Sequence, residues 1–220
     1  VGNVIDPHTI MEKNGAEPFR LWCAVEGNLE ATDLRCSEPR IEGAGKTINK
    51  LWNVAKFVSA FPKVSGKVSL CEADRWILSE LDKIVHLAND RYENYDFHNP
   101  SVALRNFLWE SFASHYLELV KARAYNSEGK FSKEEQNGAL ETLNTCLDTN
   151  LLLWAPVMPM LTSHIYSVLY SKDVHTQKFV VANGKHKTEL VTEEVCALNG
   201  QIWKAKKDAS LSLKAPVKEL

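Results

Sequence analysis

Apolar residues recur at intervals of three and four positions along most of the chain, which is the pattern of helices that bury one face. In the first forty residues glycine and proline interrupt this pattern, leaving room for two short helices, near residues 9–14 and 19–25. Farther on, the pattern predicts four long helices and a fifth, shorter one, at residues 45–60, 72–92, 101–124, 133–154 and 161–170. The short connections between the long helices predict an up-and-down antiparallel bundle.

Breaking and capping residues mark the ends of these helices. Pro62 and Gly66 follow the first long helix, and the sequence NPS at residues 99–101 precedes the third. Ser132 followed by Glu135 is a capping box at the start of the fourth. On the third helix the spacing predicts a buried stripe made of Val102, Leu108, Phe112, Tyr116 and Leu119.

The pattern changes again after residue 171. Residues 177–182 are β-prone, residues 191–207 have helical periodicity, and residues 211–213 look like the beginning of a strand. The predicted fold is therefore mainly α, an antiparallel helical bundle with a small N-terminal connecting module and a small C-terminal α/β appendage.

The overall composition indicates an ordinary globular protein, with 45% hydrophobic and 25% charged residues and a formal net charge of −2. The longest apolar run, residues 151–161, contains two prolines and is about half of the ~20 residues that a membrane span needs, so we expect no membrane partner. Five cysteines without C-x-x-C spacing predict reduced thiols in a cytoplasmic protein and no zinc site.

The local distribution of charge differs from the total. Between residues 43 and 71 there are five lysines and no acidic residue. On a helix, Lys46, Lys50, Asn53 and Phe57 fall within about 60° of one another. The opposite side carries the apolar residues that we expect in the core, Ile48, Leu51, Ala55 and Val58.

Two interpretations of this lysine face stay open at this point. Single-stranded nucleic acid is bound by cations, which neutralise phosphates, together with an aromatic ring on which an unpaired base stacks. Alternatively, the lysines are simply solvated and Phe57 packs beneath a neighbouring helix. Trp52 lies between the two sides of the helix and is predicted to join the core.

The sequence contains no motif that indicates catalysis. There is no glycine-rich phosphate loop, no G-x-S-x-G and no H-E-x-x-H, and the histidines of the helical region, at 86, 98, 115 and 164, are isolated surface or hydrogen-bonded candidates. We therefore predict no catalytic residue and no metal ligand.

Several segments resemble class I aminoacyl-tRNA synthetases. GNVIDP at residues 2–7, NGAE at 14–17 and LW at 21–22 are similar to the segment that follows the K-M-S-K-S loop in several subfamilies. The valyl type in particular is resembled by GKTINKLWNVAKFV at 45–58, ADRWILS at 73–79, YDF at 95–97 and FASHYLELVKAR at 112–123. APVMP at 155–159 is similar to a late helix common to the group, and SLSLKAP at 210–216 resembles the L-S-L-N-[AS]-P stretch after it.

The resemblance implies a division of the chain and a set of tRNA-binding residues. Residues 1–40 would form a stem-contact-like module, 41–173 the anticodon-binding helical bundle, and 174–220 the start of a small C-terminal α/β subdomain. Lys50 and Phe57 would face the anticodon loop, with Arg40 as a basic contact just before the helix. Together with the lysine face, this gives the candidate tRNA-binding set Arg40, Lys46, Lys50, Asn53 and Phe57. Pro18 stands where the family has a helix-forming residue, and it is expected to shift the start of the second helix.

The function implied is recognition of the anticodon stem-loop of a valine-accepting tRNA within a valine–tRNA ligase, which attaches valine to tRNA using ATP. Val1 stands where the K-M-S-K-S loop would end, and the H-I-G-H motif and editing insertion are missing, so this chain is expected to be an inactive piece of the enzyme. ATP, Mg²⁺ and valine would bind only to the missing catalytic domain, and the chain itself would hold no cofactor. One alternative is a fragment of an isoleucyl- or leucyl-type synthetase, against which NKLWN at 49–53 argues. The other is a helical scaffold for a protein partner.

Overall fold

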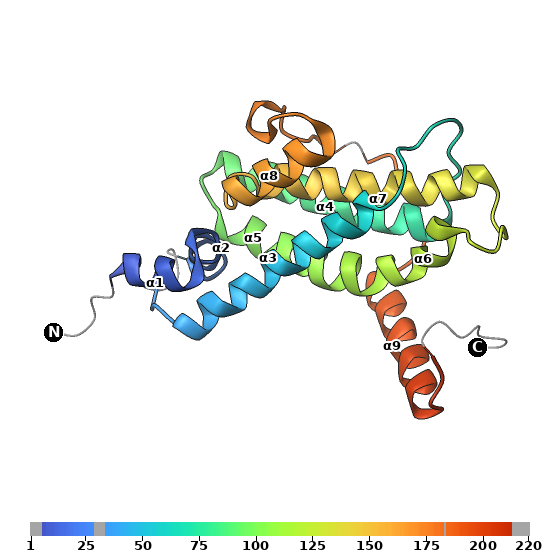
Figure 1. The fold of residues 1–220 in the computed structure, drawn as a ribbon, viewed down its shortest axis with the longest axis horizontal. Helices are drawn as coiled ribbons and strands as arrows, with labels where there is room; N and C mark the ends of the chain where they lie inside the picture. The colour runs from blue at the N-terminus through green and yellow to red at the C-terminus, as the bar shows by residue number, and fades with distance from the viewer. Residues whose placement is uncertain (1–5, 29–33, 183, 213–220) are drawn as a thin grey trace.

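The computed structural model describes residues 6–28, 34–182 and 184–212, which form a bundle of helices (Figure 1). The helices in chain order are α1 (Pro7–Asn14), α2 (Ala16–Glu26), α3 (Glu38–Ser59), α4 (Glu72–Glu93), α5 (His98–Asn106), the π-helical segment η1 (Phe107–Tyr116), α6 (Leu117–Tyr125), α7 (Lys133–Trp154), α8 (Pro159–Tyr170), the 3-10 turn η2 (Val174–Thr176) and α9 (Thr192–Asp208). The mainly α class and the antiparallel bundle are confirmed. None of the helices in the described ranges is both long and apolar enough to cross a membrane.

The helix boundaries differ from the predicted ones mainly at the N-terminal ends. α3 begins seven residues earlier than predicted, with Pro39 in its first turn, and its early residue Ile41 is buried against the N-terminal module. α2 includes Pro18 in its first turn, and α5 likewise includes Pro100. A proline costs no intrahelical hydrogen bond there, because the first N–H groups of a helix have no partner within it. Pro18 therefore does not delay the start of α2, which lies three residues before the predicted one.

The C-terminal strands that the sequence predicted are wrong as far as the structure describes them. Residues 177–182 are irregular and lie on α4, where the Val180 carbonyl accepts a hydrogen bond from Asn89 at 2.8 Å and Phe179 meets the Tyr92 ring edge-on. Residues 211 and 212 are irregular too, and residue 213 lies outside the described ranges. A strand needs a partner strand, and the neighbouring elements in the described chain are all helices. Over residues 177–182 and 184–212 the appendage is therefore α9 with irregular connections, and contains no strand.

The single helix predicted over residues 101–124 is divided by the π-helical segment. At its end the Leu117 N–H donates to the Phe112 carbonyl five residues back, and the Ser114 hydroxyl donates to the Trp109 carbonyl at 2.6 Å. A π-helix takes more residues per turn than an α-helix, so the side chains beyond it are rotated relative to the α-helical prediction. Leu108, Phe112 and Tyr116 of the predicted stripe are fully buried, whereas Leu119 is 44% exposed.

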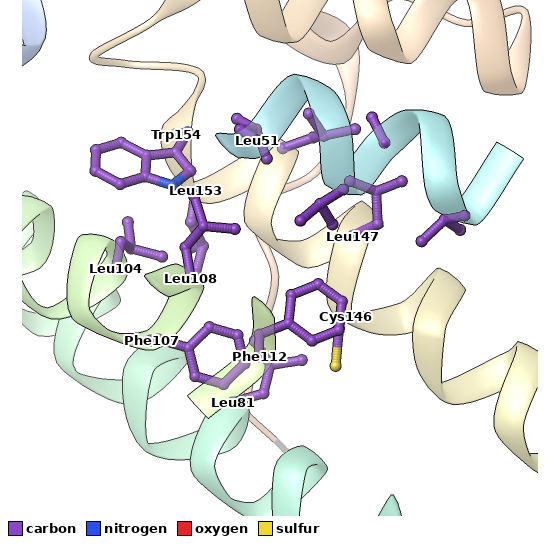
Figure 2. Close-up of a cluster of buried hydrophobic side chains, with 14 of the residues drawn as sticks. Leu51, Leu81, Leu104, Phe107, Leu108, Phe112, Cys146, Leu147, Leu153 and Trp154 are labelled. Carbon is purple, nitrogen blue, oxygen red and sulfur yellow. The ribbon is translucent and has the colours of Figure 1, made fainter. Parts of the chain in front are cut away.

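The core lies where α3, α4, η1 and α7 meet. Leu51, Ala55 and Val58 of α3 are buried there, as predicted, and Ile48 packs at the margin. Figure 2 shows side chains of these helices and of α5 directed into one cluster, among them Leu51, Leu81, Leu104, Phe107, Leu108, Phe112, Cys146, Leu147, Leu153 and Trp154. Because the apolar side of α3 is held in this cluster, its lysine side faces outward.

The last helix, α9, projects from the bundle (Figure 1) and is attached to η1 by side-chain contacts. Trp203 stacks on His115 with 5.2 Å between the ring centroids, and Asn199 lies beside the same imidazole. Burial lowers the pKa of His115. Trp76 of α4 also donates a hydrogen bond to Thr192 at the start of α9, at 3.0 Å.

Candidate nucleic-acid interface

Four of the five candidate tRNA-binding residues line one open groove between α3 and the η1–α6 segment. Lys46, Lys50, Asn53 and Phe57 enter it from α3, at successive turns of the helix. The groove has a volume of about 460 Å³, and its other lining residues are Asn49, Val54, Trp109, Ala113, Leu117 and Lys121. The structure thus brings these four residues together as the helical spacing predicts, and we call this surface the lysine groove.

The lysines that α3 contributes to the groove have no carboxylate partner. Neither Lys46 nor Lys50 forms an ion pair with any residue that the structure describes. The acidic residues near the start of α3, Glu38 and Glu42, pair with Lys13 of α1 instead. The positive charge of the groove is therefore available to an anionic ligand.

Trp109 of the π-helical segment is a groove residue that sequence reasoning missed. Its indole N–H donates to the Thr47 hydroxyl at 3.1 Å, and the Lys50 ammonium lies over its ring, 4.4 Å from the centroid. In an α-helical projection Trp109 falls beside Phe112 and Tyr116 of the predicted buried stripe, so the residue pattern did not place it in a groove. A sequence signal was available only in the residue type, since tryptophan is a common base-stacking platform.

The Phe57 ring is partly buried and partly exposed in the groove. It is half-buried against the core and lies edge-on to Phe61 at 5.2 Å and to Tyr125 at 6.2 Å, measured between centroids. Phe61 and Tyr125 also meet each other at 5.0 Å. We call Phe57, Phe61 and Tyr125 the aromatic cluster. The packing that one interpretation expects is therefore present, and the ring also lines the groove, while stacking on a base stays a prediction.

Comparison with known proteins supplies the family. The family model described as the anticodon-binding domain of tRNA ligase matches residues 74–220. The chain belongs to this family. The match starts at Asp74, after α3, but curated relatives extend the similarity over the whole chain.

The relatives include valine–tRNA ligases from archaea and bacteria. That of Pyrobaculum aerophilum is 37% identical over 96% of this chain, that of Aeropyrum pernix 34% over 99%, and that of Rickettsia typhi 34% over 100%. The chain spans only 27%, 27% and 28% of their respective lengths. Among solved structures, the LeuRS of Agrobacterium radiobacter K84, in a ternary complex with tRNA and LeuAMS, has the same fold, with a TM-score of 0.58 at 17% identity over 86% of this chain and 23% of that chain.

Arg40, the fifth candidate, lies outside the lysine groove. It stands in the first turn of α3 and pairs with Glu26 of α2. Because α3 is continuous from Glu38, Arg40 lies about 9 Å along the helix axis from Lys46 and about 120° around it. A role in binding RNA remains a prediction for the four groove residues, and for Arg40 it rests on the resemblance alone.

The prediction that Trp52 joins the core is wrong. Its side chain is 37% exposed and stacks on His164 of α8, with 5.7 Å between the ring centroids. The contact with α8 therefore covers part of Trp52 and leaves the rest at the surface.

The domain also holds a buried ionic cluster that the sequence did not reveal, which consists of Asp74, Tyr116 and Arg123. Tyr116 donates to one oxygen of Asp74 at 2.6 Å, and the Arg123 guanidinium bonds to both oxygens. Burial alone would raise the pKa of Asp74, but the hydrogen bonds from Arg123 and Tyr116 outweigh it and hold that pKa below its ordinary value. The cluster joins α4 to η1 and α6 and so fixes the segment that carries Trp109.

Proposed function

We propose that this chain is the tRNA-recognition part of a valine–tRNA ligase and that its lysine groove holds the anticodon loop. The observation that carries the proposal is a groove that combines unpaired lysines with aromatic rings, in a chain whose formal net charge is −2. The similarity to valine–tRNA ligases over nearly the whole chain supports the choice of tRNA.

In this proposal, different groove residues contact the phosphates, the base edges and the base faces of a single-stranded loop. Lys46 and Lys50 would neutralise backbone phosphates, which provides affinity that depends on salt. The Asn49 and Asn53 side chains each offer a donor and an acceptor to the edge of an unpaired base. Phe57 would stack on a base, as aromatic rings do in proteins that bind single-stranded nucleic acid.

The chemistry of the ligase would belong to other parts of the enzyme. Attachment of valine to tRNA consumes ATP with Mg²⁺, and we assign the binding of ATP, Mg²⁺ and valine to a catalytic domain beyond the residues of this chain. The chain would contribute the choice of tRNA and the positioning of its anticodon arm.

Salt dependence of binding tests the proposal. We expect the affinity of the chain for a transcript of a valine-accepting tRNA to fall steeply with salt, and Lys50→Ala to lower the slope of log K against log salt by about one. Lys83→Ala is the matched control, because Lys83 is an exposed lysine on α4, outside the groove, and pairs with Glu80.

The alternatives give different results in the same measurement. A helical scaffold for a protein partner would show weak RNA binding and the same slope for Lys50→Ala and Lys83→Ala. A leucyl- or isoleucyl-type fragment would keep the salt slope but prefer a transcript with the corresponding anticodon over the valine transcript.

A further inference from the structure

Trp109 lines the lysine groove, and the nitrogen edge of its indole ring is held by a hydrogen bond to α3. Its indole N–H is bound to Thr47, which is itself buried, so the ring is oriented by a shielded hydrogen bond to α3. Other residues of the π-helical segment, Phe107, Leu108 and Phe112, fill the core. Packing of the bundle therefore explains why these neighbours are apolar, but it does not explain why a large ring lines the groove at residue 109.

The ammonium of Lys50 covers the exposed face of this ring. A lysine over a partly exposed aromatic ring is held weakly, since the interaction is screened by water. The same ammonium forms no ion pair within the described residues, so an anionic ligand meets no competing carboxylate. Movement of the lysine from the ring to a phosphate would expose the indole face at the moment when the nucleic acid enters.

The spacing along α3 separates this ring from the aromatic cluster. Lys50, which lies over Trp109, and Phe57 are seven residues apart, which is about 10 Å along the helix axis. Neighbouring stacked bases lie about 3.4 Å apart, so this separation leaves room for each ring to contact a base of its own. The groove thus has room for a loop in which two unpaired bases contact different rings.

We propose that Trp109 is a second stacking platform for an unpaired base, and that Lys50 covers this platform until its ammonium moves to a backbone phosphate of the bound RNA. This inference rests on the proposed function of the lysine groove and adds a second base position to it. Lys121, which lines the groove from α6 and pairs with Glu118, offers a further cation to the same phosphate chain.

Fluorescence of 2-aminopurine, placed in turn at each loop position of an anticodon stem-loop RNA, tests the two platforms without changing the protein. We expect binding to the wild-type chain to quench the probe at two separate loop positions. Quenching at a single position would overturn the second platform.

Variants then assign each position to a ring. Trp109→Leu is expected to weaken RNA binding about tenfold and to relieve quenching at one position, whereas Phe57→Leu relieves it at the other. Trp109→Phe keeps a ring and should bind within about threefold of wild type. Trp52→Leu is the matched control, a partly exposed tryptophan of α3 outside the groove, and it should leave affinity and quenching unchanged.

The two proposals fail in distinguishable ways. If Trp109→Leu binds like the wild type while Lys50→Ala and Phe57→Leu bind more weakly, Trp109 is only a packing residue and the proposed function stands. If the wild-type chain binds the stem-loop no better than an unrelated hairpin, and does so without salt dependence, both proposals fail. If Trp109→Leu does not fold, the wild-type quenching pattern and the affinity of Trp109→Phe still decide the question.

Discussion

The η1–α6 segment carries polar side chains on two sides. Those on one side are buried in a hydrogen-bonded ionic cluster, and those on the other face the open lysine groove. On the inner side Tyr116 and Arg123 are buried, and both bond to the carboxylate of Asp74. On the groove side Trp109 lies beneath Lys50 of α3, which forms no ion pair with any residue that the structure describes. The comparison separates charge that holds the fold from charge that is available to a ligand.

Desolvation explains the difference between the two sides. A buried ion loses its hydration and is tolerated only with a well-placed partner and additional hydrogen bonds, which Asp74 receives from Arg123, Tyr116 and the Cys71 N–H. An exposed lysine keeps its hydration and needs no partner. Unpaired lysines gathered in one groove are therefore stable in the free protein and still attractive to phosphate.

The largest expected effect comes from breaking the inner side. Arg123→Met leaves the buried Asp74 carboxylate without its cation, and we expect a loss of about 3–5 kcal/mol in the free energy of unfolding, measured by urea denaturation. Lys121→Met is the control, because Lys121 lies on the same helix but pairs with Glu118 at the surface, and its loss should be within about 1 kcal/mol. Equal losses for the two variants would show that the buried cluster contributes no more than a surface pair.

An intermediate effect is expected at Phe57, because its ring both packs against the core and lines the groove. Phe57→Leu keeps an apolar side chain of similar volume, so we expect the free energy of unfolding to fall by less than about 1.5 kcal/mol. Loss of the ring should weaken binding of the valine transcript by about 1–3 kcal/mol. Phe61→Leu provides the control, since Phe61 shares the aromatic cluster but does not line the groove. If both variants weaken binding equally, the cluster acts by shaping the groove and not by stacking.

The sequence predicted elements best where local signals agreed. The bounds predicted for α7, residues 133–154, are those observed, because Ser132 and Glu135 form the capping box and Pro156 follows closely. The outward face of α3 was likewise predictable, since helical periodicity alone places Lys50 and Phe57 together. A strand at 177–182 was wrong because β-propensity does not supply a partner strand.

What the sequence did not predict depends on contacts between distant residues. Asp74 and Arg123 are 49 positions apart, and their pairing requires knowing how α4 packs on α6. Trp109 reaches the groove because η1 packs beside α3, and the residue pattern does not show which helices are neighbours. The part of the candidate interface that the sequence did not predict is thus the part that η1 and α6 contribute by packing beside α3.

The smallest expected effect concerns Arg40 and tests where the lysine groove ends. Arg40 is a cation on α3, as Lys50 is, but it already pairs with Glu26 and lies outside the groove. Arg40→Ala should therefore change tRNA affinity by less than about 0.5 kcal/mol and leave the salt slope unaltered, in the same titration in which Lys50→Ala lowers that slope by about one. A slope for Arg40→Ala that falls as far as that for Lys50→Ala would extend the interface to the first turn of α3. It would also show that a cation in a surface ion pair can still bind RNA. Ion pairing in the free protein would then no longer distinguish cations that hold the fold from cations that bind the ligand.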